Sequence, residues 1–471
     1  NNLGNILRKK KKFYDAINHY KKSIELNFKL SVAQSNLIES KGLICDWSNQ
    51  DVERNWLKQL GIEGSSINPL GLFYYEDNPL KQLKRAQKYY KEKYHKQSTN
   101  IATFKNKKLR IGYFSSDFRA HPTMYLISSI LKLHDKSRFD IYLYSFAPKE
   151  DDFTEIAKKS GCIFKNIKEL NDIESVELAR NDQLNIAIDL MGYIEHSRMN
   201  LFSYRVAPIQ INYLGYPGSL GADTIDYILA DKIIIPNEYE KYYSEKILRM
   251  PSCYQCNDNR KEICKEPISR QKFNLPEKGF IFTCFNSNKK ITSKEFDIWM
   301  RLLIQIKGSV LWLYKSNQCS ADNLVKEAEK RNVDPNRLIF ANSLPLNKHL
   351  ARHTLGDLAL DTFNYNGHTT TSDALWAGLP VLTKIGESFA ARVSASLLSA
   401  IGLPELITHS EKEYEKKALY LARNPDQLLN LKSKLVKSIE TTSLYDSKLF
   451  TKNLEDQLQL IVESHDVSRT I

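Results

Sequence analysis

The feature that most constrains the fold is a regular alternation of short apolar segments with helical patterns from residue 109 to residue 383. The apolar segments have the length of β-strands, and most of them run into Asp, Asn, Ser or Gly. Apolar strands separated by helices are typical of a parallel α/β sheet that helices cover on both faces. The segments fall into two series: LRIGYF, FDIYLYSF, NIAIDLMG and IDYILAD, and then FIFTCFNS, SVLWLYKS, RLIFANS, LALDTF and LPVLT.

The two series predict two Rossmann-like domains. A polar stretch that is poor in strand signals, residues 256–279, lies between them and is expected to be the crossing from one domain to the other. We place the boundary there, with an N-terminal domain over residues 109–265 and a C-terminal domain with C-terminal helices over residues 266–471. In open parallel sheets ligands bind beyond the carboxyl ends of the strands, where the polar residues of both series lie.

The N-terminal residues carry a helical pattern instead. A Leu-Gly pair is followed by small and aromatic residues at the spacing of a tetratricopeptide repeat. These residues are Leu3, Gly4, Ala16, Tyr20 and Ser23. An ordinary helical hairpin is the alternative. One repeat cannot bury its own apolar face, so residues 1–50 are expected to be a truncated array that continues upstream. The chain begins with Asn rather than Met, so any targeting segment would lie upstream too. Residues 51–108 predict a charged helical linker.

Charge and cysteine content narrow the class of protein. The net charge of +13 is concentrated in basic runs at residues 8–12 and 81–110, which could indicate nucleic acid or an acidic membrane surface. Solvated helix faces explain them more simply, and we expect no nucleic-acid partner. Seven scattered cysteines with a single C-x-x-C, at Cys253 and Cys256, favour a reducing, cytoplasmic location without a metal site. No apolar run approaches the length of a membrane span.

The segment NGHTTTSDALW, residues 366–376, is the first candidate site. It follows a predicted strand and begins a predicted helix near Thr370. The first amides of a helix have no intrahelical acceptor, and together with the helix dipole they favour a phosphate or diphosphate. The alternative is that these hydroxyl residues only cap the helix. Asp373, one turn into the helix, could cap it or hold a sugar hydroxyl.

Two further polar clusters follow predicted strands. Lys289 and Lys290 come after the strand that ends at Phe285 and Asn286, and a lysine there could neutralise a diphosphate leaving group. His121, in the segment SSDFRAHPTMY, could act on an acceptor as a general base or as a positioning donor. An ordinary surface lysine and an ordinary loop histidine are the alternatives. No P-loop, dinucleotide fingerprint or metal-binding D-x-D is found at a strand end.

These clusters, in this order, resemble the catalytic region of the protein O-linked N-acetylglucosamine transferases, the tetratricopeptide-fused GT-B enzymes of glycosyltransferase family 41. The resemblance covers nearly the whole chain from Leu109 onward, and a segment at Cys45 resembles the family's junction after its repeats. The segments that carry it are DFRAHPT, RVAPIQINYLGYPGSLGADTIDY, CFN with the following KI, YNGHTTTSDALWAGLPVLT and CDWSNQDVE.

The resemblance implies a GT-B fold and an inverting, metal-independent transfer of N-acetylglucosamine from UDP-GlcNAc to Ser or Thr hydroxyls of proteins. It implies that His368, Thr369 and Thr370 hold the diphosphate and sugar and that Asp373 contacts the ribose. Lys290 would stabilise the UDP leaving group. The C-terminal domain would then bind the nucleotide sugar, and the N-terminal domain would lie on the acceptor side. The repeats would recruit the protein acceptors.

The family pattern also implies roles for four other residues. His349 would lie against the uracil with Arg352 nearby, Asn286 would belong to the donor site, and His121 would lie near the acceptor and the sugar. Ser287 and Leu346 depart from the animal enzymes, which carry Gln and a nucleotide-contacting Lys there.

Two other functions remain open at this stage. The first is transfer of another sugar, fucose or a hexose, to protein or glycan. The related SPINDLY-type O-fucosyltransferases use GDP-fucose, but their counterpart motif lacks the Gly367-His368 pair, so UDP-GlcNAc is favoured over GDP-fucose. A tetratricopeptide scaffold with an inactive transferase domain is the other alternative, and the retention of His121, Lys290 and His368 argues against it.

Overall fold

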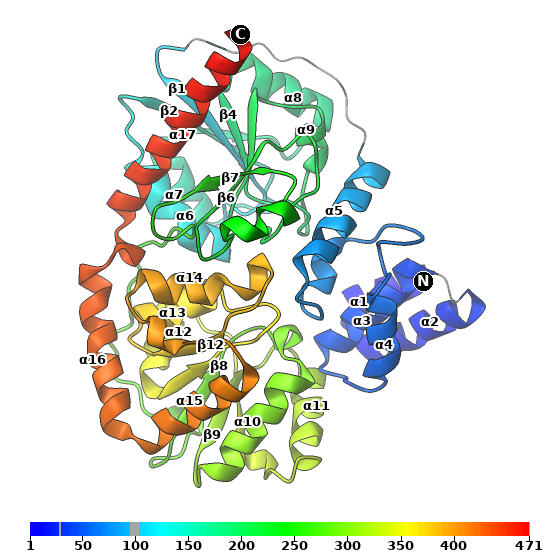
Figure 1. Ribbon diagram of the computed structural model, residues 1–471, viewed down its shortest axis with the longest axis vertical. Helices are drawn as coiled ribbons and strands as arrows, with labels where there is room; N and C mark the ends of the chain where they lie inside the picture. Colours follow the sequence, from blue (N-terminus) through cyan, green and yellow to red (C-terminus); the bar gives the residue numbers. More distant parts are fainter. Residues whose placement is uncertain (28–29, 95–103, 105, 471) are drawn as a thin grey trace. The chain divides into compact units, whose positions relative to one another are not determined.

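The computed structural model describes residues 1–27, 30–94, 104 and 106–470, with side chains to residue 465. The chain forms two compact units, each built on one β-sheet (Figure 1). Unit 1 comprises Asn1–Ile67, Gly71–Asn78 and Lys261–Thr441, and unit 2 comprises Asn68–Leu70, Pro79–Arg260 and Thr442–Ile471. The domain boundaries inferred above from the sequence, at residues 50, 108 and 265, stay predictions.

Unit 2 contains a parallel seven-stranded sheet in the order β3-β2-β1-β4-β5-β6-β7. The strand order reverses between β1 and β4, and ligands of doubly wound sheets bind at such a switch point. Its strands are β1 (Leu109–Ser115), β2 (Phe139–Ser145), β3 (Ile163–Asn166), β4 (Ile186–Asp189), β5 (Ile209–Asn212), β6 (Tyr227–Ala230) and β7 (Lys246–Arg249). Its helices are α5 (Pro79–Lys93), α6 (Pro122–Leu133), α7 (Asp152–Lys158), α8 (Asp172–Asn181), α9 (Met199–Ser203) and α17 (Ser447–Thr470).

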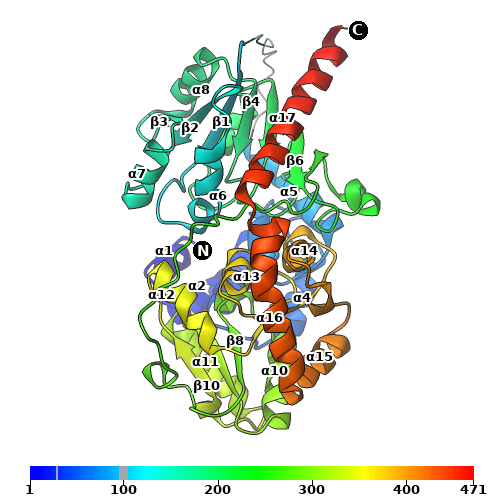
Figure 2. The same ribbon diagram turned by 90° about the vertical axis from the view of Figure 1, so that its left-hand side faces the viewer.

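The last helix, α17, belongs to unit 2 and packs along α6 (Figure 2). A buried chain of hydrogen bonds fixes this packing. His134 Nδ1 lies 2.9 Å from Glu455 Oε1 on α17, and its Nε2 lies 2.9 Å from the hydroxyl of Tyr113 on β1. Leaving one of these buried polar groups unpaired would cost free energy, so the hydrogen bonds fix the position of α17 on unit 2.

Unit 1 contains a parallel six-stranded sheet in the order β10-β9-β8-β11-β12-β13. Its switch point lies between β8 and β11. The strands are β8 (Ile281–Cys284), β9 (Val310–Tyr314), β10 (Leu338–Ala341), β11 (Leu358–Leu360), β12 (Val381–Lys384) and β13 (Ile407–Thr408). The helices are α10 (Ser293–Gln305), α11 (Gln318–Glu329), α12 (Leu346–Arg352), α13 (Thr369–Trp376), α14 (Val393–Ala400), α15 (Glu411–Arg423) and α16 (Pro425–Thr441). The predicted pair of Rossmann-like sheets is confirmed.

Four N-terminal helices complete unit 1: α1 (Asn2–Lys9), α2 (Phe13–Leu26), α3 (Ser31–Leu43) and α4 (Gln50–Leu57). Gly4 allows α1 to approach α2 closely, since a Cβ there would lie 2.5 Å from the ring of Tyr20. The helices lie beside α10 and α11 (Figure 1), where Asn317 and Asn323 each donate a side-chain hydrogen bond to a carbonyl at the end of α3. The N-terminal helices are therefore integral to unit 1.

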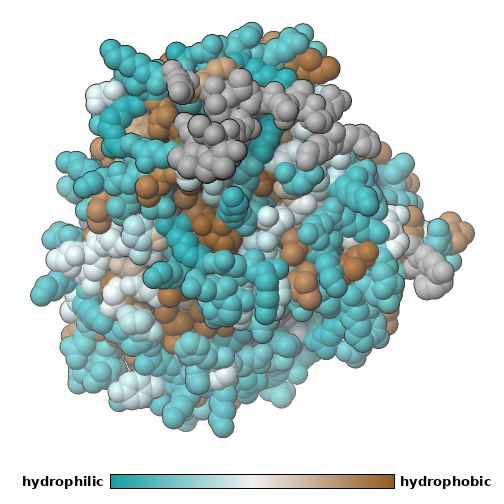
Figure 3. Space-filling view, turned by 45° about the horizontal axis from the view of Figure 1, so that its top comes forward, coloured by the Kyte–Doolittle hydropathy of each residue, from teal (hydrophilic) through white to brown (hydrophobic). Residues whose placement is uncertain are grey.

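The surface drawn in Figure 3 is mostly hydrophilic, with hydrophobic side chains in small separate groups. Within the residues described, none of the helices has both the length and the hydropathy that crossing a bilayer requires.

Candidate active site

Helix α13 begins at Thr369, one residue before the predicted start, and His368 is its N-cap. The first intrahelical bond of this turn runs from the amide of Ser372 to the carbonyl of His368, at 3.1 Å. By helix geometry the amides of Thr369, Thr370 and Thr371 have no acceptor within the helix. Thr369 and Thr370 are half-buried, and Thr370 lines a pocket. This end of α13 has the donors and the dipole that attract an anion.

The turn before α13 requires a glycine at position 367. A Cβ there would lie 2.5 Å from Thr371 Oγ1 and 3.1 Å from Asn286 Oδ1. The Gly367 amide donates to Asp361 Oδ1 at 2.7 Å, and the Gly367 carbonyl accepts from Ser394 Oγ at 3.0 Å. The turn is therefore closely packed and bonded on both sides, and the start of α13 is held in a fixed position.

Asp361, directly after β11, organises the carboxyl edge of the sheet. Besides the Gly367 amide, it accepts from Asn286 Nδ2 at 3.1 Å and from Thr383 Oγ1 at 2.7 Å. Burial raises the pKa of the Asp361 carboxyl, and its hydrogen bonds oppose that shift. These three donors come from the loop after β8, from β12 and from the turn before α13, so one carboxylate joins the segments that form the site.

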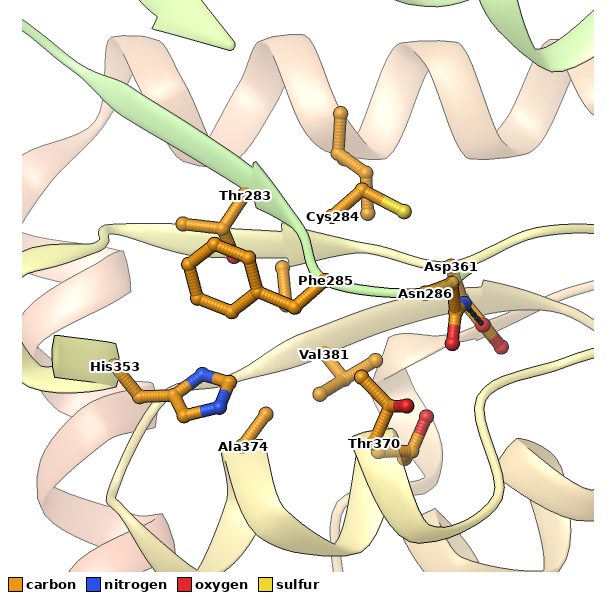
Figure 4. A pocket seen from close by; sticks show the side chains of 12 residues that line it. Thr283, Cys284, Phe285, Asn286, His353, Asp361, Thr370, Ala374 and Val381 are labelled. Atoms are coloured by element: carbon orange, nitrogen blue, oxygen red, sulfur yellow. Dashed lines mark hydrogen bonds between the residues drawn. The ribbon is translucent and has the colours of Figure 1, made fainter. Parts of the chain in front are cut away.

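A small pocket opens at this edge, lined by residues of β8, β11, β12 and α13 and of the loops between them (Figure 4). Asn286, Asp361 and Thr370 lie along its polar side, and Phe285, His353 and Ala374 lie along its apolar side. Asn286 Oδ1 is buried, and among the described residues no donor is within hydrogen-bonding distance of it. A buried acceptor without a donor at the edge of a pocket indicates a ligand position.

Lys290 lies at the end of the 3-10 turn η4 (Asn288–Lys290) and is half-buried. Its Nζ donates to the carbonyl of Asn366 at 2.7 Å, and it lies 4.3 Å from the ring centroid of Tyr365. Burial lowers the pKa of Lys290 from 10.5 to about 7, although the Asp361 carboxylate opposes this shift. The structure therefore brings Lys290 to the same turn that leads into α13.

His368 is also held in this turn. Its imidazole stacks on Tyr365, with ring centroids 4.7 Å apart, and its Nε2 lies 3.3 Å from the carbonyl of Ala390. Burial and the nearby Lys290 lower the pKa of His368 well below 6.5, so the ring is neutral. A carbonyl oxygen only accepts, so Nε2 carries the proton and Nδ1 is the acceptor.

The predicted uracil residues lie on α12, next to the pocket. The His349 ring lies 5.7 Å from that of Phe285, and the Arg352 guanidinium lies 4.5 Å from the same ring. Arg352 is buried and donates to the Asn342 carbonyl at 2.6 Å. Burial lowers the pKa of His349 to about 3 and that of Arg352 to about 10. His349 therefore offers a neutral ring to a ligand.

Asp373 is buried on α13 and forms an ion pair with Lys261 at 2.7 Å. The Lys261 carbonyl accepts from Trp376 Nε1 at 3.0 Å. The lysine comes from the polar stretch that was expected only to connect the two domains. Sequence reasoning missed it, because nothing in its local pattern marks it.

His121 belongs to unit 2, in the loop after β1 and therefore at the switch point of that sheet. Its Nδ1 lies at the start of α6, 3.3 Å from the amide of Thr123 and 3.2 Å from the buried Asp117 carboxylate. This nitrogen accepts from the amide in one tautomer and donates to the carboxylate in the other. Burial lowers the pKa of His121 while Asp117 opposes the shift, so the imidazole is neutral at pH 7.

The structure thus brings Lys290, His368 and Thr369 together at the turn that leads into α13, and Asn286 and Thr370 line the pocket of unit 1. His349, Arg352 and Asp373 lie on the adjoining helices α12 and α13, and His121 lies in unit 2. Two more residues of this region were not predicted. The strand ending LALD could have revealed Asp361, whereas no local signal marks His353.

Comparison with known proteins identifies the family. The model of glycosyl transferase family 41 matches residues 82–267 and 262–454. A probable UDP-N-acetylglucosamine–peptide N-acetylglucosaminyltransferase of Arabidopsis thaliana, SEC, is 35% identical over 356 residues, 74% of this chain and 36% of that protein. The Caenorhabditis elegans UDP-N-acetylglucosamine–peptide N-acetylglucosaminyltransferase is 26% identical over 550 residues, 88% of this chain and 48% of that protein. The chain thus spans between a third and a half of the length of these curated relatives.

A solved structure agrees. A mutant of the Thermobaculum terrenum O-GlcNAc transferase superposes with a TM-score of 0.85 at 25% identity, covering 99% of this chain and 91% of that one. The family resemblance and the GT-B fold expected from the sequence are confirmed. The family model matches most of the chain, and the chain has the two Rossmann-like sheets of the GT-B fold, so this chain is a glycosyltransferase of family 41.

Proposed function

We propose that the protein is an inverting transferase that moves N-acetylglucosamine from UDP-GlcNAc to Ser or Thr hydroxyls of proteins. One observation carries the proposal: Lys290 and the amide end of α13 converge on the turn at Asn366, beside a pocket with an unsatisfied acceptor. Such an arrangement suits a diphosphate that gains charge as the bond to a sugar breaks. The names of the Arabidopsis and Caenorhabditis relatives support UDP-GlcNAc as the donor.

In the proposed donor complex, Thr369 and Thr370 bind the diphosphate through their amides and hydroxyls. His368 accepts a hydrogen bond from a sugar hydroxyl at Nδ1. Lys290 turns from the Asn366 carbonyl towards the leaving phosphate. An adjacent anion raises the pKa of a lysine, so donor binding converts Lys290 to the charged form that stabilises UDP. No metal is required, because the lysine and the helix supply the positive charge.

The nucleoside is held by the adjoining helices. The neutral His349 ring lies against the uracil. Arg352 supports the His349 ring because both side chains pack on Phe285. Asn286 also belongs to the donor site. Asp373 accepts hydrogen bonds from the ribose hydroxyls, and Lys261 orients its carboxylate.

His121 acts on the acceptor side. In the tautomer with the proton on Nδ1, facing the Asp117 carboxylate, the neutral imidazole accepts the proton of the attacking hydroxyl at Nε2. We place the reaction in the cytoplasm, and we infer that tetratricopeptide repeats like the helices at the N-terminus recruit the acceptors.

Hydrolysis and transfer across a panel of UDP-GlcNAc, UDP-GalNAc, UDP-glucose and GDP-fucose test the donor. We expect the highest kcat/KM with UDP-GlcNAc. A preference for GDP-fucose would show that the donor is that of the SPINDLY-type relatives and would refute UDP-GlcNAc. A preference for another UDP-hexose would change the sugar but leave the leaving-group role of Lys290 intact.

A further inference from the structure

A column of three aromatic rings lies behind the start of α13. Tyr365 stacks with His368 at 4.7 Å and with Tyr74 at 4.9 Å, with interplanar angles of 22° and 18°. Lys290 lies 4.3 Å from the centroid of Tyr365, and Lys289 lies 4.4 Å from that of Tyr74. Tyr74 comes from Gly71–Asn78, the segment that follows the N-terminal helices and belongs to unit 1.

Hydrogen bonds attach the segment Gly71–Asn78 to two loops, the loop that precedes α13 and the loop that follows β12. The Tyr74 carbonyl accepts from Asn364 Nδ2 at 3.1 Å, next to the stacked Tyr365. The Asp77 carboxylate accepts from the amides of Glu387 and Ser388 at 2.8 and 2.7 Å. A Cβ on Gly386 would lie 2.2 Å from Asp77 Oδ2, so this contact is close enough to require glycine.

The loop that Asp77 holds supports His368 in turn. The Ala390 carbonyl, a few residues further along, lies 3.3 Å from His368 Nε2 and accepts from the Asn366 amide at 2.9 Å. The segment Gly71–Asn78 therefore reaches His368 by two routes, through the ring stack and through the loop after β12.

We propose that Gly71–Asn78 is part of the donor site, in which Tyr74 positions Tyr365, and Tyr365 positions Lys290 and His368 for the leaving diphosphate. This inference rests on the proposed function, because it assigns Tyr74 and Tyr365 a role only through those two residues. A lysine side chain is long and flexible, and an aromatic face fixes an ammonium group without neutralising it. Because catalysis depends on placement within about 1 Å, loss of the ring slows turnover while the fold persists.

A double-mutant cycle separates positioning from general destabilisation. On the full chain, with the donor that the panel identifies, Tyr365→Leu and Tyr74→Leu are each expected to lower kcat by about 10-fold or more with a smaller change in KM. In a Lys290→Ala background the same changes are expected to lower kcat by less than about 3-fold, because residues that act as a unit are not additive. Tyr365→Phe keeps the ring and is expected to restore turnover.

A parallel cycle on UDP affinity needs no turnover. Tyr74→Leu is expected to raise the Kd for UDP several-fold, and to have little effect when His368 is already Ala. This binding cycle decides the matter if the Lys290 double variants turn over too slowly to measure. Phe273→Leu removes an aromatic ring that packs on Trp312 in the same unit and controls for lost packing.

Two outcomes would overturn the inference: wild-type kcat and UDP affinity in Tyr74→Leu and Tyr365→Leu, or losses that add in full to those of Lys290→Ala and His368→Ala. A failure of the proposed function looks different, because Lys290→Ala itself would then retain turnover.

Discussion

Lys290→Ala removes the cation that we assign to the leaving group, and its effect can be estimated from the site. A charge about 4 Å from a developing phosphate charge, at an effective dielectric constant near 20, contributes roughly 4 kcal/mol, which corresponds to about 10³-fold in rate. Removal of one preorganised donor from an oxyanion site costs about 10²–10³-fold in kcat. We therefore expect kcat to fall by about 10²–10³-fold.

The loss is expected mainly in kcat, because the full charge on UDP develops only as the sugar leaves. UDP affinity, measured by titration calorimetry, should change less than kcat. Lys294→Ala is the matched control, since it removes an exposed lysine at the start of α10 in the same unit. The assay is steady-state release of UDP with a saturating donor. Turnover within about 5-fold of wild type in Lys290→Ala would refute the leaving-group assignment.

Three further predictions concern the same site. UDP binding at pH 8 should take up about 0.9 proton, because a lysine whose pKa is about 7 in the empty site becomes fully charged beside an anion. Calorimetry in buffers of different ionisation enthalpy measures the uptake, and Lys290→Met should abolish it. Gly367→Ala should lower the free energy of unfolding by about 1–3 kcal/mol and weaken UDP binding, because the alanine methyl group would collide with Thr371 and Asn286. An unchanged Kd for UDP would contradict the geometry of this turn. Asp361→Asn should lower the free energy of unfolding by about 2–3 kcal/mol, because an NH2 group would then face the donors that the carboxylate accepts from. Urea unfolding measures the loss, and an unchanged urea midpoint would show that this carboxylate does not organise the site.

The same lysine fixes the direction of a pH effect on stability. Its folded pKa of about 7 lies below the unfolded value of 10.5, so the unfolded chain binds more protons between these pH values. The free energy of unfolding of the wild type should therefore rise from pH 7 towards pH 10.5 relative to Lys290→Met. Thermal unfolding of both proteins across that range measures the difference, and parallel curves would contradict the lowered pKa.

The central strands of both sheets were predictable because they are buried on both faces and read as continuous apolar runs. The strands that were missed have weaker signals. β3, β7 and β13 are short and lie at sheet edges, and β3 is largely accessible. β5 is central and buried, but it has only four residues and is followed closely by the glycine-rich segment 215–221.

The local parts of the site were predictable for a similar reason. A strand, a glycine turn and a hydroxyl-rich helix start are contiguous at residues 358–376, so their chemistry can be interpreted in place. The partners of that segment come from far away in the chain. Lys261 meets Asp373 across 112 residues, and Tyr74 meets Asn364 across 290. No periodicity or motif links such positions, because only the folded packing brings them together.

The most direct test of the central claim is transfer itself. The protein is incubated with UDP-GlcNAc and a library of peptides containing Ser or Thr, and the products are analysed by mass spectrometry and by NMR of the anomeric proton. We predict N-acetylhexosamine on Ser or Thr in the β configuration, inverted from the α-linked donor, and modification about 10²–10³-fold slower with Lys290→Ala. Peptides modified in the α configuration, or modified equally by Lys290→Ala, would contradict the mechanism proposed here.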